Sequence, residues 1–365
     1  MATRALRQEA PASYEHAAKL LAECGEQGAS VRVRGAGTKL GWGPPAHPDV
    51  ELCTATLDQI VEHNAGDLTA ILQAGVRVAD AQAKFAEAGQ MLALDPPLGA
   101  ATIGGLVAAG DSGPLRHRYG AARDLVLGVR VALSDGSVAH AGGKVIKNVA
   151  GYDLAKLFSG SFGTLGAIVE VAVRLHPRRP TASAGATFED ADQLAQAARR
   201  LTHAHHEAWA IDVAWRGGQG GVLARYAGDE ARAQAGAAAA EIGGSVIEDD
   251  AYAWDDQRAG QRGDLVVRVS TVQSRLADVF RAAERQDGFV VGRAALGLLW
   301  VRLPAEAGAD GVRSLRRALA PSPCVLLDAP EEVRAEVDPW DLKEGPELEL
   351  MRRVKQRFDP AGVLL

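Results

Sequence analysis

The first 180 residues alternate between segments with helical spacing of apolar positions and segments with strand spacing. Residues 11–24 carry Ala17, Leu20 and Leu21 on one side and precede glycines, which predicts a helix. The pattern then predicts a helix early in 56–68, a second helix at about 78–88, and strands at 31–34, 69–74, 124–133 and 165–175. The sequence SDGS at 134–137 supplies a hairpin turn. These elements indicate a mixed α/β lobe.

The chain changes character after the charged, proline-containing residues 178–180. The following stretch is rich in alanine, and its pattern predicts helices that cover one face of a sheet. The expected helices are 191–204, 230–242 and 309–319, and the expected strands are 208–215, 221–227, 264–270, 288–292 and 298–303. A last helix precedes the turn FDP at 358–360. No internal repeat is visible in the sequence.

Composition and charge exclude several classes of protein. With 47% hydrophobic and 24% charged residues, the 365-residue chain can bury cores in two or three lobes. A net charge of −6 argues against a nucleic-acid-binding face. No apolar run reaches the roughly 20 residues of a membrane-spanning helix, and the N-terminus lacks a secretory signal, so we expect a cytoplasmic protein. Three separated cysteines without C-x-x-C spacing predict neither an iron–sulfur cluster nor a zinc site.

Glycine-rich sequence between residues 95 and 177 suggests how a ligand is held. Two loops, residues 34–38 and 96–113, are rich in backbone N–H groups that small side chains leave open, and such groups bind phosphate. A Rossmann site is disfavoured because the spacing in GAGTKLG fails by one residue and the loop runs into WGPP instead of a helix. A P-loop is disfavoured because valine follows GK at 143–144. Two readings remain: a phosphate-bearing cofactor on both loops, or glycines that only form turns.

Five segments, in this order, resemble one known family. They are RGAGTK, ATIGGLVAAGDSG, RYGAARDLVLGVRVALSDGSV, KNVAGYDLAKLFSGSFGTLGAIVEV and the terminal RFDPAGVLL. Together they are similar to the FAD-binding proteins of the vanillyl-alcohol oxidase (PCMH) type, and GGKVIKNVAGYDL looks most like the E subunits of bacterial glycolate oxidases. The resemblance implies an α+β fold with a two-part FAD-binding domain at 1–178, split near residue 52. It further implies an α+β cap at 179–330 and a C-terminal segment, 331–365, that returns to the FAD-binding domain.

The same resemblance assigns cofactor contacts to positions of this chain. It places the pyrophosphate on two loops and the adenine near a strand entry, with further contacts at the flavin ring. The first loop would be Arg34, Gly35, Ala36, Gly37 and Thr38, and the second Pro96, Thr102, Ile103, Gly104, Gly105, Ser112 and Gly113. The adenine side would include Gly163, Gly166 and Ile168, and the flavin side Asn148, Gly151 and Tyr152.

Two departures from the family pattern bear on the cofactor. Many relatives carry a histidine in one of the loops for covalent flavin attachment, but Thr38 and Ser112-Gly113 stand at those places, which implies non-covalent FAD. His117 is the nearby candidate for a tether. Phe162 stands where dehydrogenase relatives usually have glutamate, so a carboxylate contact to the cofactor would be lost.

The catalytic set is less complete than the cofactor loops. Lys147 and Tyr152 are the candidate catalytic residues, with Arg116, His117, Arg118 and Lys144 as further polar candidates; no metal site is expected, even at the histidines of 203–206. We expect an FAD-binding subunit of a glycolate (2-hydroxy acid) oxidase complex. It would pass electrons toward an iron–sulfur subunit, beside a second FAD-binding subunit, and could associate with a membrane through these partners. The alternatives are a self-sufficient D-lactate or glycolate dehydrogenase and a non-catalytic assembly subunit.

Overall fold

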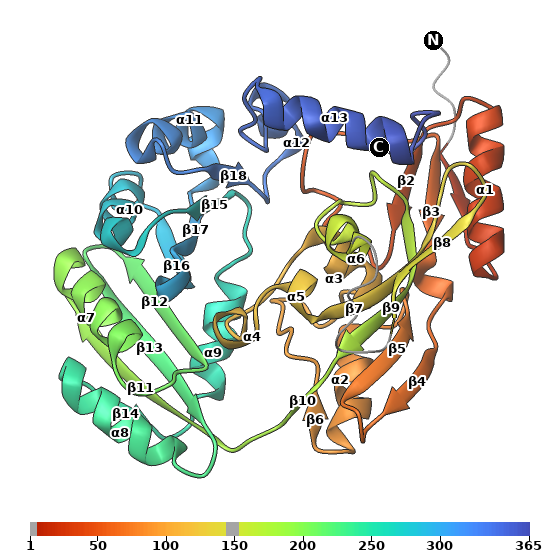
Figure 1. Cartoon of the computed structure of the whole chain (residues 1–365). Coiled ribbons are helices and arrows are strands. Elements are labelled where there is room, and N and C mark those ends of the chain that lie inside the picture. Colours follow the sequence, from red (N-terminus) through yellow and green to blue (C-terminus); the bar gives the residue numbers. More distant parts are fainter. Residues whose placement is uncertain (1–5, 144–152) are drawn as a thin grey trace.

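The computed structural model describes residues 6–143 and 153–365, whose sheets fall into an N-terminal part and a large middle part (Figure 1). A three-stranded parallel sheet has the order β1 (Arg7–Glu9), β3 (Val50–Cys53), β2 (Val31–Arg34). Helix α1 (Tyr14–Glu26) packs on it through Leu21 and Cys24, and Ser13 caps the helix by accepting a hydrogen bond from His16 N. The expected helix and the strand at 31–34 are therefore confirmed.

A five-stranded antiparallel sheet follows. Its order is β4 (Ile60–Asn64), β5 (Thr69–Gln73), β9 (Ala167–Arg174), β7 (Val126–Ala132), β8 (Val138–Gly142). The core beside it includes residues of α2 (Val78–Ala86), α3 (Ile103–Ala109), α5 (Ala122–Leu125) and α6 (Leu154–Phe158). The predicted β7–β8 hairpin is confirmed. The helix expected early in 56–68 is wrong: η1 (Thr54–Thr56) is one short turn, and β4 extends to pair with β5, whose backbone groups it satisfies.

The middle of the chain forms one eight-stranded antiparallel sheet, here called the cap sheet. Its first half contains β11 (Thr181–Phe188), α7 (Ala191–His203), β12 (Ala210–Arg216), β13 (Gln219–Ala227), α8 (Ala231–Ile242) and β14 (Ser245–Ile247). Its second half contains β15 (Val266–Ser270), α10 (Leu276–Glu284), β16 (Phe289–Arg293), β17 (Leu298–Arg302), α11 (Gly308–Leu319) and β18 (Cys324–Leu326). Both halves are βαββαβ units with strand order 4-1-3-2, joined where β12 pairs with β16. This duplication was not visible in the sequence.

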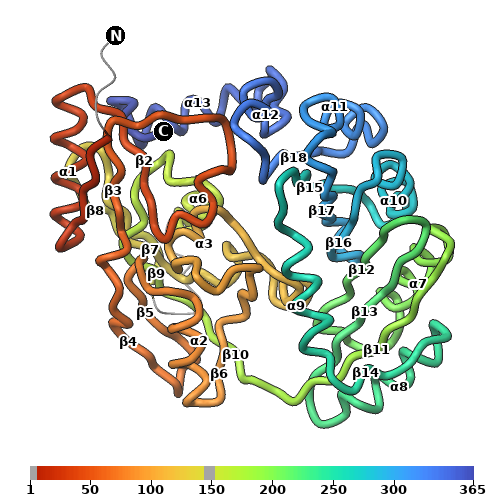
Figure 2. The backbone as a smooth tube through the Cα atoms, turned by 180° about the vertical axis from the view of Figure 1, so that it is seen from behind, coloured from red at the N-terminus to blue at the C-terminus, as the bar shows by residue number. Residues whose placement is uncertain are grey.

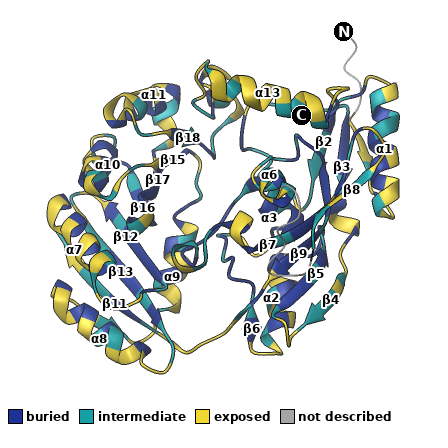
Figure 3. Cartoon of the chain, in the orientation of Figure 1, coloured by how far each residue is buried: buried dark blue, intermediate teal, exposed yellow. Residues whose placement is uncertain are grey.

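The two faces of the cap sheet differ. Helices α7, α8, α10 and α11 lie on the outer face, whereas the inner face looks toward the N-terminal sheets (Figure 1). The expected coverage of one face by helices is confirmed. The cap helices expose their outer sides, while the central strands β12, β15, β16 and β17 beneath them are mostly buried (Figure 3). Successive strand residues alternate between faces, so the inner face carries Asp212 of β12 directly opposite Arg293 of β16.

The C-terminal segment returns to the first sheet. Helix α12 (Glu331–Glu336) and helix α13 (Pro346–Phe358) lead the chain back past the cap, and the C-terminus lies beside β2 (Figure 2). Asp359 accepts hydrogen bonds from Val363 N at 3.1 Å and Leu364 N at 2.9 Å, and Val31 N donates to Val363 O at 2.7 Å. Smaller elements complete the described chain: β6 (Gln90–Met91), β10 (His176–Pro177), α4 (Arg116–Tyr119), α9 (Ala251–Ala259) and the 3-10 turns η2 (Gln273–Arg275), η3 (Ala294–Leu296) and η4 (Ala305–Ala307).

None of the helices in residues 6–143 and 153–365 combines the length and apolar character needed to cross a membrane.

Candidate cofactor site

The two glycine-rich loops meet in space. Loop 1 (Arg34–Thr38) leaves β2, and loop 2 (Pro96–Gly113) contains α3. A Cβ at Gly35 would lie 2.1 Å from Thr102 Oγ1, so this contact requires glycine. Thr102 caps α3 by accepting a hydrogen bond from Gly105 N at 3.3 Å. The close approach of the loops places their backbones around one hollow.

Two cavities lie against loop 1. One, of about 190 Å³, is lined by loop 1 and the chain on either side of it, by one side of α3, and by four residues from distant segments, namely Phe162, Thr164, Trp340 and Leu365. The other, of about 430 Å³, shares with it the loop residues Arg34, Gly35, Ala36 and Thr102. An extended ligand that follows loop 1 would therefore be in contact with both loops.

The glycines of loop 2 have different surroundings. Gly105 faces the smaller cavity, and an added Cβ would meet only Thr102 Oγ1, at 3.0 Å. A Cβ at Gly104 would instead lie 2.5 Å from the Ala74 Cβ, and one at Gly113 would lie 1.7 Å from Asp95 O. Gly104 and Gly113 thus permit tight packing of the protein on itself, whereas Gly105 leaves room for a ligand. Pro96, Ile103 and Ser112 are buried in the same loop.

The residues expected at the adenine side lie next to the hollow rather than in its lining. Gly163, with φ of +80°, packs against Val33, and Gly166 packs against Val131. Ile168 is buried in β9. Lys144, Lys147, Asn148, Gly151 and Tyr152 lie outside the described residues, so their expected roles stay predictions.

Phe162 forms part of an aromatic wall. Its ring centroid lies 4.7 Å from that of Trp340 and 6.4 Å from that of Trp42, and all three line the smaller cavity. Its φ of 55° is in the left-handed region, so the surrounding packing must hold this residue in place. At the position where glutamate was expected from dehydrogenase relatives, this chain therefore presents an apolar surface to the cavity.

The lining suits a diphosphate-bearing ligand. Small side chains at Gly35, Ala36 and Gly37 leave backbone N–H groups accessible, and successive N–H groups of this kind bind phosphate. The buried Arg34 Nε has no hydrogen-bond partner among the described residues. Arg32 and Lys39 add two further cationic side chains to the lining, of which Lys39 is the one next to loop 1. Its Nζ forms an ion pair with Asp111 at 3.1 Å, which joins loop 1 to loop 2.

Comparison with known proteins identifies the ligand. Residues 9–142 match the FAD binding domain family. The cofactor is therefore FAD. The whole chain superposes on alkyldihydroxyacetonephosphate synthase with a TM-score of 0.72 over 98% of this chain and 76% of that one, at 13% identity. This likeness shows the PCMH-type FAD-binding fold.

Curated relatives match the FAD-binding half. The chain is 36% identical to glycolate oxidase subunit GlcD of Bacillus subtilis over 190 residues, 51% of this chain and 40% of that protein. It is 42% identical to subunit GlcE of Escherichia coli over 126 residues, 34% and 36% of the two chains. It is 33% identical to a D-lactate dehydrogenase of Archaeoglobus fulgidus over 169 residues, 46% and 38%. The matches span less than half the length of these relatives.

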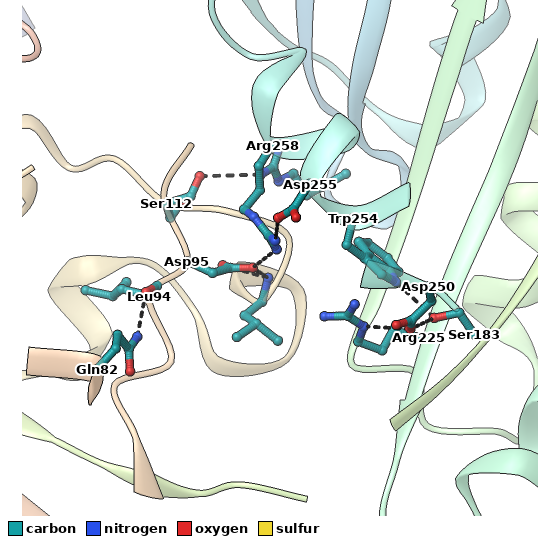
Figure 4. Close-up of polar contacts among 12 residues, drawn as sticks. Gln82, Leu94, Asp95, Ser112, Ser183, Arg225, Asp250, Trp254, Asp255 and Arg258 are labelled. Atoms are coloured by element: carbon teal, nitrogen blue, oxygen red, sulfur yellow. Dashed lines mark hydrogen bonds and ion pairs between the residues drawn. The ribbon is translucent and has the colours of Figure 1, made fainter. Parts of the chain in front are cut away.

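A buried polar cluster joins loop 2, and Asp95 just before it, to the inner face of the cap sheet. Asp95 accepts a hydrogen bond from Leu115 N at 3.1 Å and lies 3.7 Å from Arg258 of α9 (Figure 4). Burial raises the pKa of Asp95 to about 7, although Arg258 and Arg293 oppose the shift. Arg293, fully buried, donates to Ser112 O at 3.4 Å and stacks on Trp300. Side chains of the cap thus contact loop 2 directly.

Two neighbouring arginines carry charge without a matching carboxylate. Arg268, on the inner face of β15, forms no hydrogen bond or ion pair with any other described residue, and its Nε is buried. The side chain of Arg116 in α4 has, among the described residues, a single hydrogen bond, a 3.5 Å contact to Ser112 Oγ. Burial lowers the pKa of both guanidinium groups, and Arg116 lowers that of Arg268 further. Because Asp111 already pairs with Lys39, positive charge remains beside loop 2.

His117, the candidate tether, lines a different cavity. That cavity, of about 280 Å³, lies between α4 and the cap, where Thr202, His206 and Glu207 complete its lining. Burial lowers the pKa of His117. Within the described ranges, no group of three or more His, Cys, Asp or Glu side chains could hold a metal ion.

Sequence reasoning missed Lys39, Trp42, Asp212, Arg268 and Arg293. Two of the cap residues had a detectable signal, since Arg268 interrupts the apolar strand sequence VVRVS and Asp212 interrupts AIDVAWR.

Proposed function

We propose that this chain is the FAD-binding subunit of a glycolate oxidase-type complex that oxidises a 2-hydroxy acid. The observation that carries the proposal is the unpaired arginine pair, Arg116 and Arg268, at the junction of the FAD loop and the cap sheet. Planar guanidinium groups bind carboxylates through paired hydrogen bonds, and a partly buried pair of them favours an anion. The names of the curated relatives, glycolate oxidase subunits and hydroxy-acid dehydrogenases, support the same substrate class.

Each residue then has a defined task. Oxidation of a 2-hydroxy acid to a 2-oxo acid removes two electrons and two protons, and FAD, when bound, supplies the electron acceptor. Arg116 and Arg268 bind and orient the substrate carboxylate. Arg293 holds Ser112, and with it loop 2, in place. Lys147 and Tyr152 are proposed to contact the reacting end of the substrate.

The proposed complex includes a partner that carries the iron–sulfur cluster. Cys24, Cys53 and Cys324 are unpaired and belong to separate elements, so they supply no cluster ligands as a group. We propose that electrons leave toward an iron–sulfur subunit, beside a second FAD-binding subunit. A self-sufficient D-lactate or glycolate dehydrogenase is the second candidate, favoured by the D-lactate dehydrogenase relative.

The test is anaerobic reduction of the bound flavin by glycolate and by D-lactate, with and without the co-purified subunits. We expect Arg268→Met to weaken apparent substrate affinity about 10- to 100-fold, the loss of one charge-assisted contact, while FAD content is unchanged. Arg352→Met, which removes an exposed arginine paired with Glu344, is the control. No reduction by any 2-hydroxy acid in the complex would overturn the proposal, and full turnover by the isolated chain would favour the second candidate.

A further inference from the structure

The residues directly after loop 1 form hydrogen bonds with side chains of the cap. Asp328, which follows β18, accepts hydrogen bonds from Arg262 Nε at 2.6 Å and Nη2 at 2.9 Å. The same carboxylate accepts a hydrogen bond from Trp42 Nε1 at 2.8 Å. Asp328 and Arg262 are only 12% and 23% exposed, so solvent screens this network less than it screens a surface ion pair.

Arg262 also reaches loop 1 itself. Its Nη2 donates to Thr38 O at 3.1 Å, and its guanidinium lies 5.6 Å from the centre of the Trp42 ring. Thr38 is the last residue of the loop that lines the FAD cavity. One cap arginine therefore fixes the backbone of the cofactor loop and the tryptophan that follows it.

The C-terminal segment contacts the same residues from another side. Arg334 donates to Gly43 O at 3.2 Å. Trp340 packs so tightly that a Cβ on Gly43, whose φ is +89°, would lie 2.7 Å from its ring. Residues 38–43 are thus enclosed by side chains that lie more than 200 positions away in the sequence.

We propose that Arg262 and Asp328 are positioning residues for FAD: they hold loop 1 in its binding conformation, so cap docking and FAD affinity are coupled. A loop of small residues loses conformational freedom when it binds a ligand, and contacts that order it beforehand reduce that loss. Coupling is reciprocal, so FAD must also tighten the cap around residues 38–43. The inference rests on FAD binding alone and needs no substrate.

The experiment measures FAD affinity of the apo full-length chain by flavin fluorescence, together with the melting temperature before and after FAD addition. We expect Arg262→Gln to raise the Kd for FAD about 10- to 100-fold, and Arg262→Lys, which keeps one link to Asp328, to recover part of the affinity. The control is Arg232→Gln, because Arg232 and Glu248 form an exposed bidentate pair elsewhere in the cap. Its Kd should equal that of the wild type.

A purely structural role gives a different result. If Arg262→Gln lowers the melting temperature of the apo chain but leaves the Kd for FAD within twofold, the proposal is overturned. Should that variant fail to fold, Trp42→Phe removes the indole donor to Asp328 while it keeps an aromatic ring at this position, and we expect it to raise the Kd for FAD several-fold. An unchanged Kd in Trp42→Phe would also contradict the proposal. These measurements do not involve substrate, so a failure to oxidise 2-hydroxy acids would change neither the Kd for FAD nor the melting temperature.

Discussion

At the scale of single residues, the glycines of the FAD site have separate tasks. Gly104 lets α3 approach Ala74, and Gly113 lets loop 2 pass Asp95, whereas Gly105 opens toward the cavity. A side chain at the first two positions would collide with the protein, and a side chain at the third would extend into the cavity. Folding and FAD binding can therefore be disturbed independently within one loop.

We predict that Gly105→Val abolishes or weakens FAD binding at least tenfold while the chain stays folded, because the added methyl groups enter the cavity. Gly104→Val should instead lower the free energy of unfolding by about 1–3 kcal/mol through overpacking against Ala74. FAD titration and urea unfolding separate the two effects. Gly236→Val, in α8 with no atom near its Cβ position, is the control. Normal FAD affinity in Gly105→Val would contradict this placement of the cofactor.

Asp95 makes stability depend on pH in a defined direction. Its pKa rises from 3.8 to about 7 in the folded chain because it is buried, with Asp212 adding to the rise and Arg258 and Arg293 opposing it. The stability contributed by this carboxyl is full below pH 4 and is lost as the pH rises through about 7. Relative to Asp95→Asn, the wild type should lose about 2–4 kcal/mol of unfolding free energy between pH 4 and pH 8. Urea titrations across that range test this; a pH-independent difference would show that Asp95 does not hold the proton.

At the scale of elements, local pattern predicted most strands and helices because their apolar periodicity survives in the fold. Strand β4 was not predicted because its sequence, IVEHN, is short and half-exposed, and it forms a strand because it pairs with β5. The duplication within the cap was not predicted because its two halves have the same strand order but no visible sequence similarity. Local sequence thus specified the glycine loops, whereas the contacts of Lys39, Trp42 and Arg268 depend on segments brought together only by folding.

The C-terminal segment is a second element whose attachment depends on one residue. Buried Asp359 accepts hydrogen bonds from Val363 N and Leu364 N and pairs with Lys355, which donates to Thr164 O at 2.8 Å beside the FAD cavity.

Asp359→Ala should lower the free energy of unfolding by about 3–5 kcal/mol, because it removes the carboxylate partner of Lys355 and leaves the N–H groups of Val363 and Leu364 without their acceptor. We also expect faster proteolysis of the C-terminal residues. Asp310→Ala removes an exposed partner of Arg313 and should change stability by about 0.5 kcal/mol or less. Equal effects of the two substitutions would contradict the proposed attachment.

At the scale of the whole molecule, the FAD-binding part and the cap meet through buried charge as well as apolar packing. Trp42 and Ala109 pack against Val291 and Trp300 of the cap, and beside them Arg293 lies opposite Asp212. Both Asp212 oxygens are buried without a hydrogen-bond partner in the described chain, and burial raises the pKa of Asp212. The positive charge of Arg293 is therefore the main compensation for this carboxylate within the interface.

Removing that charge should be more harmful than removing both members of the pair. We expect Arg293→Met to lower the free energy of unfolding by about 3–5 kcal/mol near pH 8, since it removes the main positive charge that compensates the buried Asp212 and leaves Ser112 O without this donor. Adding Asp212→Asn should restore part of the loss, and the recovery should shrink at pH 5, where the wild-type carboxyl more readily takes up a proton. A double-mutant cycle in urea measures the coupling. Strict additivity at both pH values would show that the two side chains do not interact, and the charge of Arg293 would then not compensate Asp212 at this junction.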